Sequence, residues 1–163
     1  MTTFPERLIK KGPLPGHASI PGLEPRGALW LAVRIGDVEL QVINTHLGLV
    51  PGEQRAQAKA LVGDGWLGAP ARRDPLVVVG DFNATPRAVA YGTLASVLME
   101  SRRVAPRVRA VPTFPSRLPV LAIDHVFVSA GVSVEGVSTP DDPLARRASD
   151  HLPLIVDFRL DPA

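Results

Sequence analysis

The chain has 163 residues, of which 45% are apolar, and a net charge of +2, so we expect a single domain over residues 1–163 that buries a core. The absence of cysteine excludes a disulfide framework and a thiolate metal site. No apolar run approaches the roughly 20 residues that span a bilayer, and the N-terminus lacks a signal-peptide apolar region, so we expect a cytoplasmic protein without a transmembrane segment.

The first part of the chain predicts an irregular segment followed by a hairpin. Residues 1–25 contain five prolines and three glycines with little periodicity, which indicates an irregular lead-in. The apolar residues 28–35 predict a strand, and the alternating residues 38–44 predict its partner. Gly36 and Asp37 between them are a two-residue hairpin signal.

Two segments carry helix signals. Strong helix formers at 53–62 predict a helix that stops at Gly63. Thr85 is a plausible N-cap, and Pro86 would occupy the first helical position. These two residues predict a second helix that ends at about Met99.

The remaining apolar segments predict four more strands. Between two of them, the basic residues 100–119 form a long loop, and loops of that length in a compact domain are usually functional or mobile. The order of elements implies an α/β fold with a mixed β-sheet and helices on one face. The four predicted strands are 76–79, 121–129, 132–137 and 152–160.

Polar side chains follow several predicted strands at the point where each strand ends. After the strand at 76–79 comes Gly80, which lets another group come close, and then Asp81 and Asn83. Strand ends of one sheet converge on one edge, so such groups can gather in a single cleft. The full set is Asn44, His46, Asp81, Asn83, Asp124, Asp150 and His151.

Each of these groups has an ordinary structural explanation when taken alone. A histidine after a strand is more often structural than catalytic, and the D-F-N sequence is consistent with an Asx turn. Together, three carboxylates, two imidazoles and carboxamides favour a hard divalent cation, Mg²⁺ first, with Mn²⁺ or Ca²⁺ as alternatives. A carboxylate beside a histidine also fixes its tautomer. The set is suited to the attack of water on a phosphoester.

Five short segments, four of which carry these residues, occur in a recognisable order and spacing. They are N-T-H-L-G-L at 44–49, G-D-F-N-A-T-P at 80–86, T-F-P-S at 113–116, I-D-H-V-F-V-S at 123–129 and S-D-H-L-P-L at 149–154. Over about residues 24–158 the pattern resembles the endonuclease/exonuclease/phosphatase superfamily. Its members include pancreatic deoxyribonuclease, apurinic endonucleases, neutral sphingomyelinases and inositol polyphosphate 5-phosphatases.

The resemblance implies roles for the residues of the first two segments. His46 matches the histidine that contacts the scissile phosphate, and Asn44 precedes it in the same phosphate-binding motif. Asp81 matches the aspartate that orients or deprotonates the attacking water and that serves the metal. Asn83 matches the asparagine that binds phosphate and positions the nucleophile.

The last two segments supply the other implied site residues. Asp124 matches the carboxylate that hydrogen-bonds the final histidine of the family. Asp150 matches a metal-site carboxylate, and His151 matches the histidine that binds phosphate and stabilises the pentacovalent phosphorus. The resemblance therefore implies a metal-dependent phosphoesterase that uses in-line attack by water.

The chain departs from the family pattern in one respect. The family's first half supplies an asparagine after the first strand and a glutamate in a Q-E motif, and no Q-E occurs in this sequence. Glu24 matches a family stretch that leads into a strand and is not a ligand there. The resemblance thus implies the C-terminal half of the family domain, half of its four-layer sandwich, with one sheet whose inner face has lost its mate.

Two physical consequences would follow from such a half domain. The metal site would lack its main carboxylate, and strands such as L-V-V-V and L-P-L-I-V would expose a large apolar patch. We therefore expect the chain to self-associate face to face or to pair with a separate N-terminal half.

Two functions remain open on the sequence. The first is a metal-dependent phosphoesterase that acts on nucleic acid, a phospholipid headgroup or a phosphorylated small molecule. For this function, the basic loop from Arg102 to Arg117, which contains Phe114, would lie where family members recognise their substrates. The second is a non-catalytic remnant that binds phosphate or a partner, which the missing glutamate favours.

Overall fold

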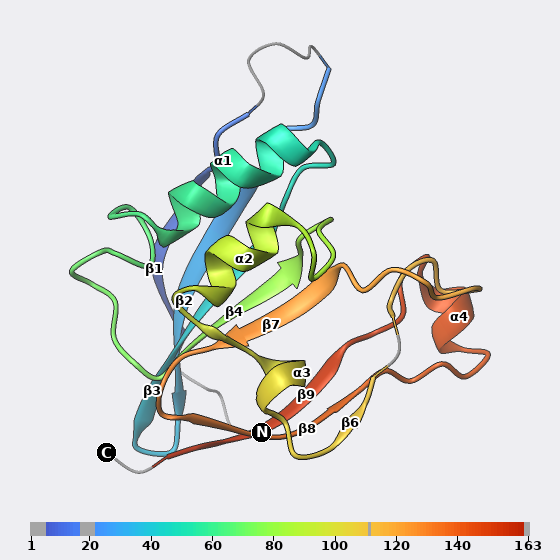
Figure 1. Ribbon diagram of the computed structural model, residues 1–163. Helices are drawn as coiled ribbons and strands as arrows, with labels where there is room; N and C mark the ends of the chain where they lie inside the picture. Colours follow the sequence, from blue (N-terminus) through green and yellow to red (C-terminus); the bar gives the residue numbers. More distant parts are fainter. Residues whose placement is uncertain (1–5, 17–21, 111, 162–163) are drawn as a thin grey trace.

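The computed structural model describes residues 6–16, 22–110 and 112–161, which form two β-sheets and four helices (Figure 1). The larger sheet has the strand order β1-β2-β3-β4-β7-β5, and the smaller has the order β6-β8-β9. The strands are β1 (Glu6–Pro13), β2 (Gly27–Ile35), β3 (Val38–His46), β4 (Leu76–Asp81), β5 (Met99–Glu100), β6 (Val108–Arg109), β7 (Asp124–Val128), β8 (Val132–Ser138) and β9 (Ile155–Leu160). The helices are α1 (Pro51–Val62), α2 (Val89–Ala95), α3 (Ser101–Val104) and α4 (Ala145–Ala148).

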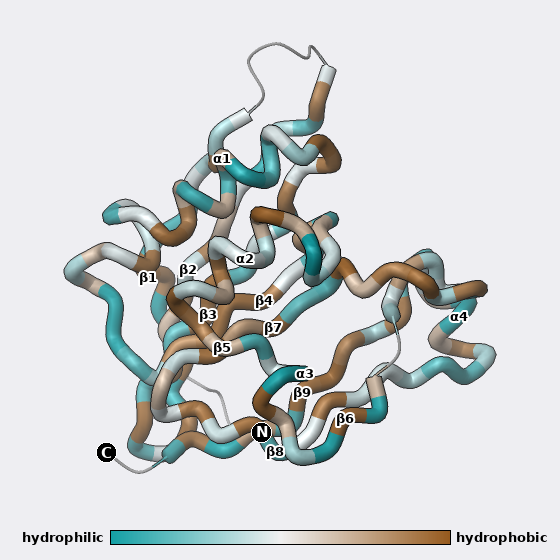
Figure 2. The backbone as a smooth tube through the Cα atoms, in the orientation of Figure 1, coloured by the Kyte–Doolittle hydropathy of each residue, from teal (hydrophilic) through white to brown (hydrophobic). Residues whose placement is uncertain are grey.

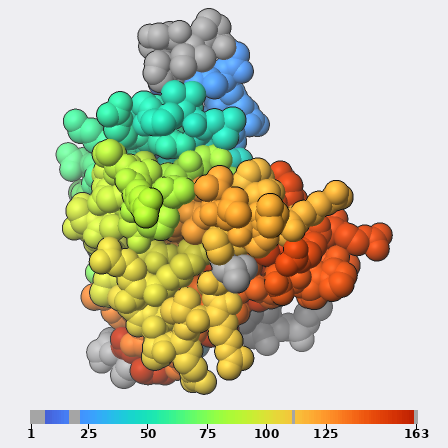
Figure 3. Space-filling view, turned by 45° about the vertical axis from the view of Figure 1, so that its right-hand side comes forward, coloured from blue at the N-terminus to red at the C-terminus, as the bar shows by residue number. Residues whose placement is uncertain are grey.

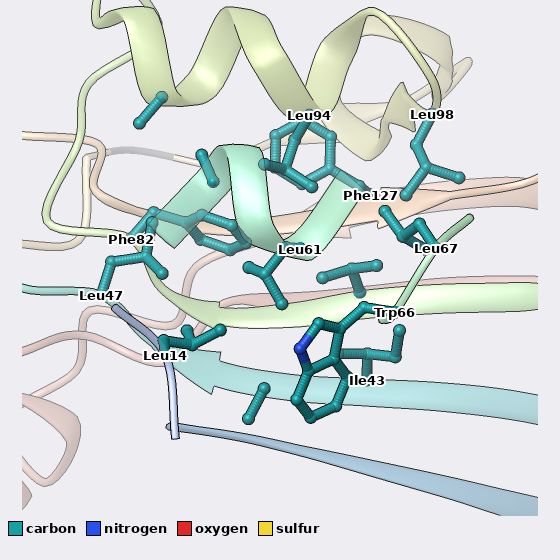
Figure 4. Packing of buried hydrophobic residues seen from close by; sticks show 14 of the residues in the cluster. Leu14, Ile43, Leu47, Leu61, Trp66, Leu67, Phe82, Leu94, Leu98 and Phe127 are labelled. Atoms are coloured by element: carbon teal, nitrogen blue, oxygen red, sulfur yellow. The ribbon is translucent and has the colours of Figure 1, made fainter. Parts of the chain in front are cut away.

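One face of the larger sheet is covered by α1 and α2, as predicted (Figure 1). Ile43 and Phe127 point from the sheet into this layer, where Leu61 of α1 and Leu94 of α2 meet them (Figure 4). Trp30 of β2 belongs to the same buried cluster. All five side chains are buried. Burial of apolar area at about 25 cal/mol per Å² makes this layer the main source of stability.

The opposite face of the larger sheet is partly covered by the smaller sheet. Leu40, Val77 and Val128 of the larger sheet are buried in a second apolar cluster with Val132 and Val137 of β8. Brown segments along β4 and β9 in Figure 2 mark the two hydrophobic strands that face this layer. The expectation of a single sheet without a mate is therefore wrong, because this chain builds two sheets by itself.

This second layer also removes much of the expected apolar patch. Val77 is 4% exposed, and its neighbours Leu76 and Val78 are fully buried. In β9, by contrast, the side chains alternate between exposed and half-buried, and Ile155 is 43% exposed. The L-V-V-V strand thus gives no reason for self-association, whereas β9 retains a partly exposed apolar surface.

The observed elements confirm the predicted hairpin and the predicted central strand. The turn at Gly36 has a positive φ of 60° and joins β2 to β3. The helix expected at 53–62 begins two residues earlier, at Pro51. The strand expected at 121–129 is shorter, because Leu121 forms only an isolated bridge with Phe114.

Three predicted segments differ from the structure. The loop expected at 100–119 contains α3 and β6, because residues 108–109 pair with β8 in the smaller sheet. Within the expected irregular lead-in, Glu6–Pro13 is a strand that pairs with β2, while residues 1–5 and 17–21 lie outside the described residues. Lys10 in this strand obscures the apolar pattern of the sequence, because a charged residue does not indicate packing. Its ammonium nevertheless packs over the Trp66 ring at 4.6 Å and donates to the Gly65 carbonyl. The second helix covers only Val89–Ala95, because Met99 pairs with Val128 at the sheet edge instead.

The order of strands explains why one edge of the sheet collects polar groups. Strands β3 and β4 are parallel, so His46 and Asp81 end at the same level. Strand β7 runs antiparallel to β4, and its first residue, Asp124, lies directly opposite Asp81. Among the described residues, none of the helices has the length and apolar character needed to span a bilayer.

Gly80→Ala is expected to lower the free energy of unfolding by about 3 kcal/mol, because Gly80 has a φ of +148° and a Cβ there would overlap the Thr45 carbonyl oxygen. Urea unfolding measures the loss. The matched control is Gly92→Ala in α2, where a Cβ meets nothing within 4 Å; it should be neutral or stabilising by up to about 1 kcal/mol. Equal effects of the two substitutions would contradict this account of the strand contact.

Candidate active site

Five of the seven residues expected at the site lie together at this edge of the larger sheet. His46 and Asp81 end neighbouring strands, and Asn83 follows in the loop after β4. Asp124 begins β7, and His151 lies in the loop before β9. Each is therefore fixed by a strand end or by a loop bonded to one.

Asp81 lies between the two imidazoles. Its Oδ2 is 3.3 Å from Nε2 of His46 and 3.8 Å from Nε2 of His151. Its Oδ1 accepts a hydrogen bond of 2.8 Å from the Asn83 backbone N–H, which closes an Asx turn. Its side chain is 17% exposed. One carboxylate oxygen thus fixes the loop, and the other faces the shared space between the histidines.

His151 and Asp124 form a hydrogen-bonded pair. Nδ1 of His151 lies 2.8 Å from Oδ2 of Asp124, so its N–H donates to the carboxylate and Nε2 is directed toward Asp81. Burial alone lowers the pKa of His151, but the hydrogen bond and charge of Asp124, with the charges of Asp81 and Asp150, outweigh burial and raise that pKa. His151 therefore holds its second proton to a higher pH than a free imidazole.

His46 receives a hydrogen bond from a residue that the sequence did not single out. Nη1 of Arg26 lies 3.1 Å from Nδ1 of His46, and Arg26 also pairs with Glu24 at 3.1 Å. A guanidinium can only donate, so Nδ1 of a neutral His46 must accept. The ring proton of that tautomer is on Nε2, which donates toward Oδ2 of Asp81 at 3.3 Å. The Asn83 amide nitrogen, which also only donates, is then a close neighbour of Nε2 and not a hydrogen-bond partner.

Asn83 links the two loops that carry His46 and Asp81. Its φ is +47°, a left-handed conformation that Asn tolerates better than most residues. Its Nδ2 donates to the Leu47 carbonyl at 2.9 Å and lies 3.2 Å from Nε2 of His46. The Asn83 carboxamide is therefore held beside His46.

A cation would relieve a charge problem at this edge. Asp81 and Asp124 are cross-strand partners, and like charges placed directly opposite each other are destabilising. Their oxygens and a nitrogen of His151 lie within 4.8 Å of one another, a set that could hold a metal ion. Oxygen-rich donors of this kind fit Mg²⁺ or Mn²⁺.

The other two expected site residues lie at the margins. Asn44 is exposed two residues before His46, in a shallow hollow that Leu29 also lines. Asp150 is exposed, and its Oδ1 lies 3.3 Å from Oγ of Ser149. Asp150 is not a member of the three-residue group of possible metal ligands.

The loop before β9 is held in place by the T-F-P-S segment. Phe114 packs against the His151 ring with centroids 4.8 Å apart. Oγ of Ser116 donates to the Ser149 carbonyl at 2.7 Å, and the Leu152 N–H donates to the Thr113 carbonyl. The motif at 113–116 thus orients His151 and does not itself contact Asp81 or His46.

Two residues that support the site were missed from the sequence. Arg26 lies in a proline-rich segment, but the two-residue turn at Gly36 sets a register that pairs Ala28 with Thr45 and brings Arg26 to the level of His46. Counting outward from that turn would have found it. Gln54 of α1 bonds the loops on the other side and had no signal in the sequence except a polar residue on the buried face of the helix.

The raised pKa of His151 predicts how stability depends on pH in metal-free buffer. The folded chain binds this proton more tightly than the unfolded chain, so its contribution is complete below the ordinary value of 6.5 and is lost as pH rises through the raised pKa. We expect the stability advantage of the wild type over His151→Gln to shrink as pH rises above 6.5 and through the raised pKa. Urea unfolding in EDTA measures it, and parallel pH curves for the two proteins would contradict it.

The sequence model of the Endonuclease/Exonuclease/phosphatase family matches residues 6–151 of this chain. A UPF0294 protein of Vibrio cholerae is 35% identical over 146 residues, which are 83% of this chain and 46% of that protein. The uncharacterized protein YbhP of Escherichia coli K12 is 26% identical over 87% of this chain and 56% of its own length. The chain therefore spans about half the length of the curated relatives it matches.

Solved structures share the fold. The mannosyl-6-phosphatase of Bacteroides thetaiotaomicron superposes with a TM-score of 0.80 at 20% identity, covering 95% of this chain and 67% of that one. At this identity the likeness concerns the fold alone.

Proposed function

Since the chain belongs to the Endonuclease/Exonuclease/phosphatase family, we propose that it hydrolyses a phosphodiester or phosphomonoester by in-line attack of water, with a divalent metal. One observation carries the proposal: Asp81 and Asp124 face each other across two strands, each with a histidine beside it. A structural role alone would not explain two carboxylates and two imidazoles directed into one space.

The residues divide the reaction between them. Water attacks phosphorus while Asp81 accepts its proton, and the bond from phosphorus to the leaving oxygen breaks with its electrons going to that oxygen. In its protonated form, which the hydrogen bond and charge of Asp124 favour, His151 donates to the developing charge, and its proton can pass to the leaving oxygen. Asn83 and His46 hold the phosphate, and Arg26 keeps the His46 proton on the reacting side.

We place the metal at the carboxylate side of this site. Asp81 and Asp124, with Asp150 at the margin, would hold it, and Mg²⁺ or Mn²⁺ suits these oxygen donors. When bound, the metal supplies charge neutralisation at the phosphate oxygens. Phosphate binding is the task we assign to Asn44 as well, from its place beside His46.

The substrate side of the site is the projecting lobe formed by residues 112–121 and 139–150. Figure 3 shows its orange residues standing out from the surface. A pocket of about 720 Å³ lies between the two parts of the lobe, beside Asp150, with Arg117 and Arg147 among its lining residues. Guanidinium groups there suit an anionic substrate such as nucleic acid, a phospholipid headgroup or a sugar phosphate.

A second candidate function is phosphate or partner binding without hydrolysis. The group Asp81, Asp124 and His151 offers only two carboxylates, and the sequence has no Q-E motif. For either function, a separate N-terminal half or a second copy of the chain would supply the missing carboxylate. The partial exposure of Leu29 and Ile155 is consistent with such pairing.

The deciding experiment is hydrolysis of bis(p-nitrophenyl) phosphate and of p-nitrophenyl phosphate by the chain, with Mg²⁺, with Mn²⁺ and with EDTA. The hydrolase proposal predicts turnover with metal and a loss of at least about a hundredfold in EDTA. No turnover of either ester by a folded chain, together with phosphate binding in calorimetry, would support the binding function instead.

A further inference from the structure

The buried side of α1 is polar where an amphipathic helix is normally apolar. Its buried residues include Glu53, Gln54 and Gln57 beside Ala58 and Leu61. Buried carboxamides are retained where they satisfy buried backbone groups. The polar face of α1 therefore has specific backbone partners.

Gln54 binds the two loops that carry catalytic groups. Gln54 is only 5% exposed. Its Nε2 donates to the Gly48 carbonyl at 3.0 Å and to the Asn83 carbonyl at 2.8 Å. The Gly48 loop continues from β3 and His46, and Asn83 follows β4. Both N–H bonds of one amide are thus spent on holding two separate strand ends together.

Helix α1 packs tightly against the backbone of the loop at Gly48. A Cβ at Gly48 would overlap the carboxylate of Glu53, and the Gly48 N–H donates to Oε1 of Gln57 at 2.8 Å. The helix is therefore in direct contact with the backbone of the His46 loop. A shift of Gln54 would move that loop relative to Asn83.

Asn83 depends on such support because its left-handed φ of +47° is a conformation that surrounding contacts must maintain. The same residue approaches His46 through its side chain at 3.2 Å. The carbonyl bond from Gln54 and the side-chain contact with His46 act on the same residue from opposite ends. The backbone bond thus helps to set the side-chain contact.

We propose that Gln54 is a positioning residue that sets the spacing of His46 and Asn83, an inference that rests on the proposed function for its kinetic consequence. Gln54 touches no substrate. Its effect passes through the carbonyls of Gly48 and Asn83.

The chain offers a matched control in Gln41. This residue is 1% exposed, donates from Nε2 to the Ala71 carbonyl at 3.1 Å and accepts from the Arg73 N–H at 2.9 Å. Its two bonds also join a carboxamide to backbone, but at the loop that leads into β4. Gln54→Met and Gln41→Met therefore remove similar bonds at opposite ends of the sheet.

In the metal-supplemented hydrolysis of bis(p-nitrophenyl) phosphate, Gln54→Met should lower kcat by about 10- to 100-fold with KM within about threefold of the wild type. Gln41→Met should leave kcat within about twofold of the wild type. Its Tm should fall by about as much as the Tm of Gln54→Met falls. Gln54→Glu, which keeps the shape but has no N–H, should behave like Gln54→Met. An unchanged kcat in both Gln54 variants, or equal kcat losses in the Gln54 and Gln41 variants, would overturn the proposal.

A second readout does not depend on activity. The imidazole NMR signals of His46 should shift in Gln54→Met and stay in place in Gln41→Met. If the wild type hydrolyses nothing, the proposed function fails, but this comparison still decides whether Gln54 positions His46. Unshifted His46 signals in a folded Gln54→Met protein would overturn the inference.

Discussion

Asp81→Asn is expected to lower kcat for phosphoester hydrolysis by about a thousandfold or more, because it removes both the proton acceptor for water and a metal-binding charge. The fold should persist. An Asn oxygen can still accept the 2.8 Å bond from the Asn83 N–H that closes the turn after β4. Steady-state kinetics at saturating metal measures the effect.

The control for charge is Asp157→Asn, an exposed carboxylate of β9 outside the site. It makes the same chemical change and should leave kcat within about twofold. A folded Asp81→Asn protein with more than about a tenth of the wild-type kcat would remove Asp81 from the reaction.

The second large effect is expected for His151→Ala, with a loss of about 10²–10³ in kcat. Nε2 of this ring faces Asp81, and Nδ1 is held by Asp124 at 2.8 Å. Removal of the ring takes away the donor to the developing charge and leaves Asp124 without its partner.

Because His151 and Asp124 act as a unit, their effects should not add. At metal concentrations that saturate every variant, so that loss of Asp124 as a possible metal ligand does not lower occupancy, Asp124→Asn in the His151→Ala background is expected to cost less than about threefold further in kcat, whereas Asp124→Asn alone costs about tenfold or more. Full additivity in this double-mutant cycle would mean that Asp124 acts on the reaction without His151.

The local pattern of the chain predicted the elements that carry the site. Three β-branched residues before Gly80 indicated the central strand β4, and the turn at Gly36 indicated the hairpin β2–β3. Strand ends then predicted the edge where His46 and Asp81 meet. These inferences succeeded because each depends on residues close in sequence.

The second sheet could not be predicted in the same way. The alternation in 132–138 and 155–160 indicates strands but not which sheet they join. Membership depends on contacts such as that of Val77 with the β8 cluster, between segments far apart in the chain. Helix α2 was overestimated because pairing of Met99 with Val128 outweighs helix propensity.

The candidate site was predictable where its residues are of types that commonly act in catalysis or metal binding. Asp81, Asn83 and His151 stood out by residue type and by family resemblance, and they lie together in the structure. Arg26 hydrogen-bonds the His46 ring, and Gln54 hydrogen-bonds the backbone of Asn83; such partners are visible only in three dimensions.

In the proposed reaction, water oriented by Asp81 attacks phosphorus at this site. The decisive measurement is hydrolysis of bis(p-nitrophenyl) phosphate by the chain with Mn²⁺ in water enriched in oxygen-18, with Asp81→Asn run beside it. We predict that the p-nitrophenyl phosphate formed carries one oxygen-18, that the p-nitrophenol carries none, and that Asp81→Asn forms almost no product. Label in the p-nitrophenol, or product formation at the wild-type rate by Asp81→Asn, would contradict the account.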